Sequence, residues 1–316
     1  MEHPDQLHLK ARFEAMKQSK LAGPKRRWMD IWDRFLFTGC DPRVVPVLRI
    51  GYAILILIQV ATLWNDAGYW FSDQGVMQTA TAQGMNGPTD WSLFFWLPSE
   101  PWVIQGCLGS LFVHAFLMLL GVYSRFQAIA IFVWLVSMQH RNPLIHDGED
   151  TVFRIFAFIM AWLPLDASCS LLSRMRSTSS TAPMTSANVW ALRLIQIEMT
   201  AIYASTALSK LPGETWRNGS ALWYVSRMTD NFGRWISPAW FDLPYYSTIA
   251  TYSTLAIELF LPIGLWIPRT RNLAIVLGIL LHLGIEVSMN LFLFEWIMIL
   301  GLITFYRRAQ KTDVVV

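Results

Sequence analysis

Eight apolar segments constrain the fold of this chain more than any other feature of its sequence. A transmembrane helix needs about 20 mostly apolar residues, since each residue adds about 1.5 Å to its length. Hydrophobic residues make up 54% of the chain and charged residues only 15%, a balance typical of membrane proteins. The segments are residues 44–63, 102–123, 126–139, 152–165, 190–209, 248–267, 273–287 and 291–305.

We therefore predict an all-α, polytopic membrane protein with about eight transmembrane segments. The third, fourth, seventh and eighth segments are short. They leave open whether those helices are tilted, re-entrant or partly broken.

The positions of lysine and arginine predict the orientation in the membrane, because cytoplasmic loops carry an excess of both. Nine of these residues precede the first apolar segment, whereas residues 64–101 contain none. We expect an integral, multi-pass protein with both termini in the cytoplasm. In the absence of an organelle signal, we expect a bacterial plasma membrane. The net charge of +3 mainly reflects the excess of lysine and arginine in the predicted cytoplasmic segments, so it gives no reason to expect nucleic acid as a partner. The expected partner is the lipid bilayer.

The sequence predicts an amphipathic helix near the N-terminus, where Trp28, Trp32 and Phe35 recur at helical spacing. This helix is expected to lie on the inner leaflet. The predicted parts of the chain are a cytoplasmic segment at 1–31 that includes the start of this helix, a membrane domain at 32–306 with a cytoplasmic linker at 170–188, and a cytoplasmic tail at 307–316.

Aromatic residues crowd the two long loops on the predicted non-cytoplasmic side. Nine of the sixteen tryptophans lie in or beside residues 64–102 and 211–246. Tryptophan favours the headgroup region of a bilayer, so an aromatic belt is one explanation. The density of rings also favours interfacial helices that cover the outer face, which suits a lipid-soluble substrate.

Ionisable residues inside apolar segments are costly, so each one is a candidate functional residue. Arg49 could form a buried structural ion pair with Glu198 or Glu258. Other polar residues, Glu295 among them, lie in the outer half of their segments. His282 and Glu286 share a helix face but lack a third ligand at metal-binding spacing, so no metal is predicted. The candidates for a pocket within the helices are Arg154, Tyr203, His282 and Glu286.

The loop at residues 139–150 is dense in titratable groups, with two histidines and three carboxylates in twelve residues. Such density favours function over simple solvation. We expect this loop to line the same outward-facing pocket. Its candidate residues are His140, Arg141, Asn142, His146, Asp147, Glu149 and Asp150.

Lys210 ends an apolar segment where the chain turns into a tryptophan-rich loop. A lysine in this position can extend its ammonium group to water, or it can act as a base. Gln196 and Tyr203 precede it at intervals of seven residues, so the three side chains share one stripe of the helix.

A series of motifs in this order resembles the horizontally transferred transmembrane (HTTM) domain family, whose best-characterised relative is vitamin K-dependent gamma-carboxylase. The resemblance extends over nearly the whole of residues 32–305. The matching stretches are 41–43, 48–51, 120–125, 141–145, 147–150, 203–219, 258–262 and 291–294, together with His282 and Met289.

The resemblance implies a quinol-dependent carboxylase or oxygenase. The cofactor that it implies is reduced vitamin K or menaquinone, and the small substrates are O₂ and CO₂. Lys210-Leu211 followed by Trp216 is similar to the motif that carries the carboxylase's base, with one extra residue. The resemblance thus implies that Lys210 is the base. An ammonium group cannot accept a proton, so burial must favour the neutral amine. His146 lies near a further histidine of that family and is the second catalytic candidate.

The chain ends at Val316, so the resemblance predicts no large lumenal substrate-binding domain. A protein partner would then have to supply the acceptor. Two other interpretations stay open: a transporter of lipids or small molecules that uses the same cavity, and a non-catalytic membrane component that acts through partners.

Overall fold

The computed structural model describes residues 24–37, 41, 43–167, 169–171, 189–291 and 293–307. Most of the predicted linker at 170–188 lies outside the described residues. So do the first 23 residues and all but the first residue of the predicted tail at 307–316.

The described residues are helical, and no strand occurs among them beyond an isolated bridge between Phe232 and Met289. The predicted all-α class is therefore confirmed. The longer helices are α2 (Pro24–Phe37), α3 (Val44–Leu63), α6 (Pro101–Leu120), α7 (Ser124–Arg141), α8 (Gly148–Met160), α10 (Val189–Lys210), α13 (Tyr246–Gly264), α14 (Arg271–Ser288) and α15 (Phe294–Ile303). Short helices fill two loops. The first outer loop, residues 64–100, contains α4 (Ala67–Phe71), α5 (Thr79–Met85) and the 3₁₀ turn η1 (Leu93–Phe95). The second outer loop, residues 211–245, contains α11 (Glu214–Arg217), α12 (Ala221–Val225) and η3 (Pro238–Asp242).

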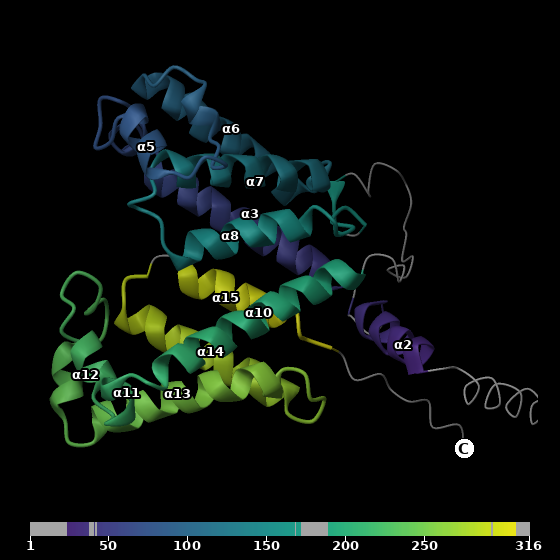
Figure 1. The fold of residues 1–316 in the computed structure, drawn as a ribbon, viewed down its shortest axis with the longest axis vertical. Helices are drawn as coiled ribbons and strands as arrows, with labels where there is room; N and C mark the ends of the chain where they lie inside the picture. Colours follow the sequence, from purple (N-terminus) through teal and green to yellow (C-terminus); the bar gives the residue numbers. More distant parts are fainter. Residues whose placement is uncertain are drawn as a thin grey trace, which may run out of the picture.

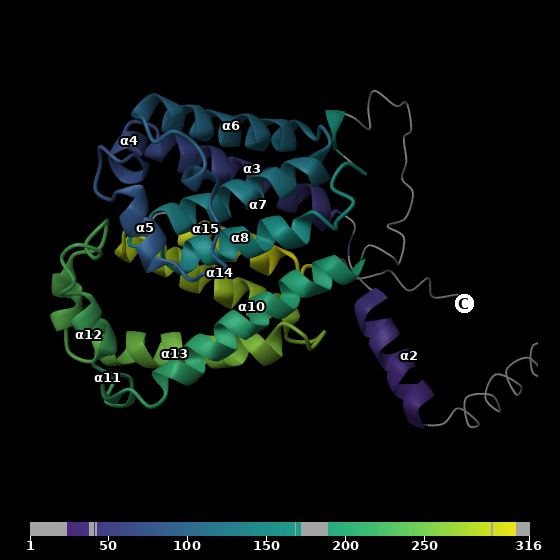
Figure 2. The ribbon, with the colours of Figure 1, turned by 45° about the horizontal axis from the view of Figure 1, so that its top comes forward.

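The helices form two groups that meet at α15 (Figure 1). The first group contains α3 to α8, in which α3 packs on α6, α6 on α7 and α7 on α8. The second contains α10 to α14, in which α13 contacts both α10 and α14. Helix α15 contacts α3 and α8 on one side and α10 and α14 on the other. Figure 2 shows α4, α5, α11 and α12 at one end of both groups, which we call the outer end.

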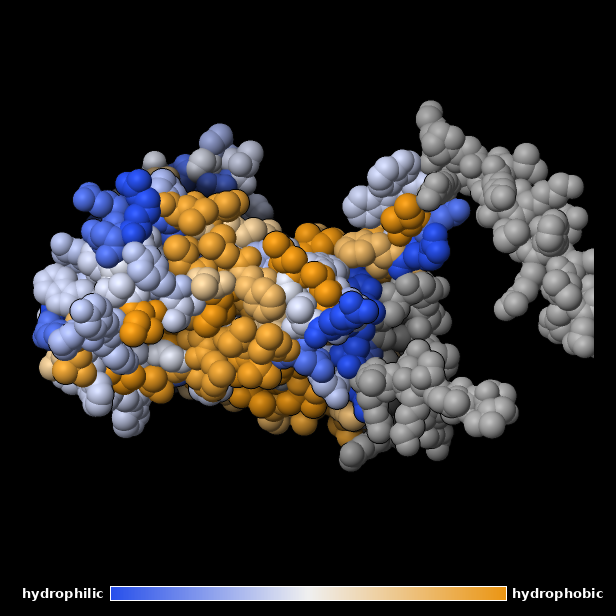
Figure 3. Space-filling model, turned by 90° about the horizontal axis from the view of Figure 1, so that it is seen from below, coloured by the Kyte–Doolittle hydropathy of each residue, from blue (hydrophilic) through white to orange (hydrophobic). Residues whose placement is uncertain are grey.

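Three described helices are long and apolar enough to cross a membrane, namely α3, α6 and α14. Helix α15 is apolar but shorter, with 10 residues. A broad hydrophobic surface runs between hydrophilic residues at the two ends of the molecule (Figure 3). Length, composition and this surface together indicate a membrane protein.

Helix α8 is shorter than the predicted segment at 152–165, since it ends at Met160. Pro164 explains the difference, because a proline ring clashes with the carbonyl of the fourth residue before it. The chain therefore turns, with Leu163 N–H donating to the Met160 carbonyl at 3.0 Å.

Arg49 binds this turn and not the glutamates that we expected. Its guanidinium donates to the carbonyls of Leu165 at 3.0 Å and Cys169 at 2.6 Å. The expected pairing with Glu198 or Glu258 was therefore wrong. Buried backbone carbonyls outside a helix need hydrogen-bond donors, and a buried arginine can supply them. The absence of a side chain at Gly121 leaves room for the Arg49 guanidinium, because a Cβ atom there would lie 2.5 Å from Arg49 Nη1.

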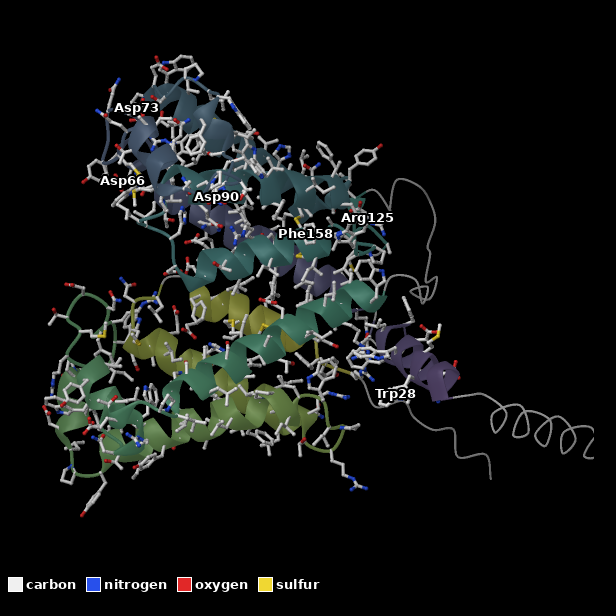
Figure 4. All side chains as sticks on the ribbon, in the orientation of Figure 1. Trp28, Asp66, Asp73, Asp90, Arg125 and Phe158 are labelled. Atoms are coloured by element: carbon white, nitrogen blue, oxygen red, sulfur yellow. The ribbon has the colours of Figure 1, made fainter. Side chains whose placement is uncertain are left out.

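The amphipathic helix α2 is attached to the second group through Phe35. The Arg193 guanidinium lies 5.3 Å from the Phe35 ring centroid and donates to the Phe35 carbonyl at 2.9 Å. Trp28 and Trp32 remain exposed, and Figure 4 shows Trp28 on a helix that projects from the bundle. In the same view Asp73 and Arg125 mark opposite ends of the first group.

Candidate functional site

Lys210 is the last residue of α10, and its ammonium group is held by two neighbours. It bonds both carboxylate oxygens of Glu258 on α13, at 2.6 Å to Oε2 and closer to Oε1. Its Nζ also lies 4.9 Å from the ring centroid of Trp216 on α11. We call Lys210, Glu258 and Trp216 the lysine cluster.

The turn after α10 is what brings Trp216 over the lysine. Gly213 N–H donates to the Lys210 carbonyl at 3.0 Å, and a Cβ atom at Gly213 would lie 3.1 Å from Trp216 Cδ1. The side chain of Glu258 is 8% exposed and that of Lys210 is 24% exposed, so the pair is only partly open to solvent.

Within the lysine cluster, the ammonium group of Lys210 is paired with a carboxylate and lies over an indole face. For Lys210 to act as the expected base, its ammonium group must first lose a proton, and the sequence does not suggest how. Glu258 has to accept the lysine proton, or move away, before Nζ can act as a base.

A second set of side chains lies deeper in the molecule, where α10, α14 and α15 meet. We call it the tyrosine chain. The Tyr203 hydroxyl on α10 lies 2.6 Å from His282 Nε2 on α14. The other ring nitrogen, Nδ1, bonds Glu295 Oε2 on α15. Tyr203 and His282 are each 3% exposed, and Glu295 is fully buried. Three helices thus supply one continuous hydrogen-bonded path.

Glu295 is absent from the predicted pocket residues, although the sequence carries a signal for it. It is the single charged residue of α15, whose sequence is FEWIMILGLI. A lone carboxylate in an apolar helix needs a polar partner. His282 supplies that partner from α14, which the sequence alone does not identify.

His146 and Asp150 form the centre of a third set at the start of α8. His146 Nδ1 lies 2.9 Å from Asp150 Oδ2, and Asp150 Oδ1 accepts from Gln59 Nε2 on α3 at 3.2 Å. Asp147 and Asp150 also cap α8 reciprocally. The arrangement leaves His146 Nε2 and Gln59 Oε1 buried with no hydrogen-bond partner among the described residues. Gln59 is a further polar residue that sequence reasoning did not select.

Glu149 links this third set to the tyrosine chain. Its Oε2 accepts from the Leu293 N–H at 3.2 Å, two residues before Glu295. Glu149 precedes the apolar segment that begins at residue 152. Burial, together with the nearby carboxylates of Asp147 and Asp150, raises its pKa to about 7.

Three predicted pocket residues of the 139–150 loop bind the backbone of the first outer loop. His140 Nδ1 lies 2.7 Å from the Trp91 carbonyl. Arg141 donates to the Met77 carbonyl at 2.8 Å and to Asp73 at 3.1 Å. Asn142 donates to the Trp70 carbonyl at 2.9 Å. These contacts hold α4, α5 and η1 against α7.

The remaining candidates are dispersed. Glu286 pairs with Arg234 in the second outer loop and not with His282. Arg154 and Glu198 are half-buried on α8 and α10. Among the residues described, no three His, Cys, Asp or Glu side chains are grouped so as to hold a metal ion.

Comparison with known proteins assigns the family. The HTTM domain model matches residues 37–309, so this chain belongs to the HTTM domain family, as the motifs predicted. The chain is also similar to the sporulation-delaying protein SdpB of Bacillus subtilis (strain 168), at 25% identity over 213 residues. That match covers 62% of this chain and 62% of SdpB. No solved structure matches significantly.

Proposed function

We propose that this HTTM protein is an eight-span membrane enzyme of the quinol-dependent carboxylase or oxygenase type. The proposal includes cytoplasmic termini, a bacterial plasma membrane, and interfacial helices at the outer end. The apolar lengths of α3, α6 and α14 support the membrane placement. The polar sets at the outer ends of α8, α10 and α14 support a site that opens outward.

One observation carries the proposed chemistry, namely that Lys210 lies between Glu258 and the Trp216 ring. An aromatic face and an acid–base pair fit a quinol, which has a flat ring and an ionisable hydroxyl. Reduced vitamin K or menaquinone would supply the reducing power for reaction with O₂, ahead of capture of CO₂ by an acceptor. Within the chain, Glu258 takes the proton of Lys210, and the neutral amine then accepts the hydroxyl proton of the quinol.

His146 is the second proposed acid–base residue. Asp150 binds Nδ1, which leaves Nε2 as the free nitrogen. A carboxylate that orients an imidazole in this way is the arrangement used by many histidine bases. A partner protein would provide the acceptor.

The test is quinone epoxide formation in proteoliposomes that contain reduced menaquinone, O₂ and labelled bicarbonate. We expect Lys210→Ala and Glu258→Gln to reduce product by about 100-fold or more. The control is Arg227→Ala, which removes the exposed pair with Asp242 in the second outer loop. Quinol binding without epoxide in the wild type would overturn the proposal.

The second candidate function is a non-catalytic membrane component that acts through partner proteins. The closed Lys210–Glu258 pair favours it, because each charge already has a partner. In that case Lys210→Ala lowers the stability of the protein, and neither the wild type nor the variant forms quinone epoxide. A transporter of lipids or small molecules is the third possibility, and it would tolerate Lys210→Arg in an uptake measurement.

A further inference from the structure

The tyrosine chain has the composition of a proton relay. A carboxylate accepts hydrogen bonds, so the contact with Glu295 assigns the proton to Nδ1 of His282. Nε2 is then the acceptor, and Tyr203 donates its hydroxyl proton to it. The tyrosine oxygen keeps its lone pairs and can accept a proton from a ligand.

Glu295 provides the driving force for proton uptake. Its Oε1 is buried with no hydrogen-bond partner among the described residues, and the residue is fully buried. A buried carboxylate with a hydrogen bond to only one oxygen is poorly stabilised in its charged form. Accepting a proton relieves that cost.

We propose that Tyr203, His282 and Glu295 form a proton relay that deprotonates a hydroxyl group of a lipid-soluble aromatic ligand. This inference rests on the proposed function, because it names a second proton acceptor for the same substrate class. Tyr203 lies seven residues before Lys210 on the same stripe of α10, about 10 Å deeper along the axis.

The step balances in protons and charge. The ligand O–H bond breaks as its proton moves to the Tyr203 oxygen. The tyrosine proton moves to His282 Nε2, and the Nδ1 proton moves to Glu295 Oε2. The products are a ligand oxyanion, a neutral tyrosine, a neutral histidine and a protonated glutamic acid. No oxidant or reductant takes part.

The test uses 2-naphthol, whose neutral and ionised forms differ in absorbance. The full-length chain in proteoliposomes carries Lys210→Met, so that the lysine cannot ionise the probe. We expect the bound naphthol to be ionised at a lower pH than free naphthol. Adding Tyr203→Phe should reduce the ionised fraction at a given pH by about tenfold and leave the binding constant within about threefold. Glu295→Gln should have the same effect.

Tyr52→Phe is the matched control. Tyr52 is also fully buried, and its hydroxyl donates to the Phe153 carbonyl at 2.8 Å, outside the relay. It should lose stability without any change in probe ionisation. Equal ionisation in Tyr203→Phe and Tyr52→Phe, or no ionisation before either change, would overturn the relay. Absence of probe binding to the unsubstituted protein would instead overturn the proposed quinol site, and the relay with it.

Discussion

The two helix groups use their outer polar residues in different ways. In the first group Arg141 and Asn142 donate to backbone carbonyls of the loop that contains α4 and α5. In the second group Lys210 binds Glu258, and His282 binds both Tyr203 and Glu295. A backbone carbonyl cannot take up a proton at neutral pH, whereas paired side chains exchange protons. Arg141 and Asn142 therefore hold the fold. The side-chain pairs of the second group, and His146 with Asp150 at the start of α8, are suited to acid–base chemistry.

The largest expected difference between the two groups is in turnover. Glu258→Gln should reduce epoxide formation by about 100-fold or more, because an amide cannot accept the lysine proton. Arg141→Gln should keep turnover per folded molecule within about twofold. Mass spectrometry of the quinone product, normalised to folded protein, measures both. A comparable loss of turnover in Arg141→Gln would contradict the assignment of Arg141 to the fold and of Glu258 to acid–base chemistry.

The second prediction concerns stability in the first group. Arg141 is fully buried and contacts the Met77 carbonyl and Asp73. Arg141→Ala should lower the free energy of unfolding by about 3 kcal/mol, because it leaves a cavity and an unpaired buried carbonyl. Thermal unfolding in detergent, followed by tryptophan fluorescence, measures the loss. An unchanged Tm would contradict the structural role that the comparison assigns to this residue.

The third prediction uses Glu149, which lies where the two groups meet. Its folded-state pKa of about 7 is above the usual value of 4.5, so the folded state binds a proton more tightly than the unfolded state. The stability that this provides is complete below pH 4.5 and is lost as pH rises through 7. Between pH 5 and 7 the loss should be about 2 kcal/mol.

Glu149→Gln should remove that pH dependence, because glutamine does not titrate and still offers an oxygen to the Leu293 N–H. The comparison is between the unfolding temperatures of the two proteins across the same pH range. Parallel curves would show that Glu149 does not titrate as described.

The smallest effects separate buried from exposed contacts. Asn142 is fully buried, so Asn142→Ala should cost about 1–2 kcal/mol through the lost bond to the Trp70 carbonyl. Arg227→Ala removes an exposed pair with Asp242 and should cost less than about 1 kcal/mol. Chemical unfolding of both variants ranks the two values. The reverse order would indicate that the outer loops contribute more stability than burial suggests.

Several features of the fold followed from local sequence. Hydrophobic runs marked the helices, and α3 coincides with the predicted segment at 44–63. The contact between Lys210 and Trp216 is also local, since only five residues, with a turn at Gly213, lie between them. The short segment at 152–165 was left open as tilted, re-entrant or partly broken, and Pro164 is the physical reason that α8 ends at Met160.

The partners of the charged residues could not be predicted from local sequence. Arg49 was expected to bind Glu198 or Glu258, yet it binds the turn after α8. Apolar helices offer many equivalent packing arrangements, so a hydrophobic pattern does not state which polar faces meet. Helix α10 is an example, because apolar residues surround its polar stripe.

The sequence by itself determined that this is a helical membrane protein of the HTTM family, because apolar length and ordered motifs are properties of the chain alone. Only the tertiary structure decided that Lys210 meets Glu258, 48 residues away, and that His282 joins Tyr203 to Glu295. The physical reason is that a buried charge requires a partner, while the identity of that partner depends on how α10, α13, α14 and α15 pack together.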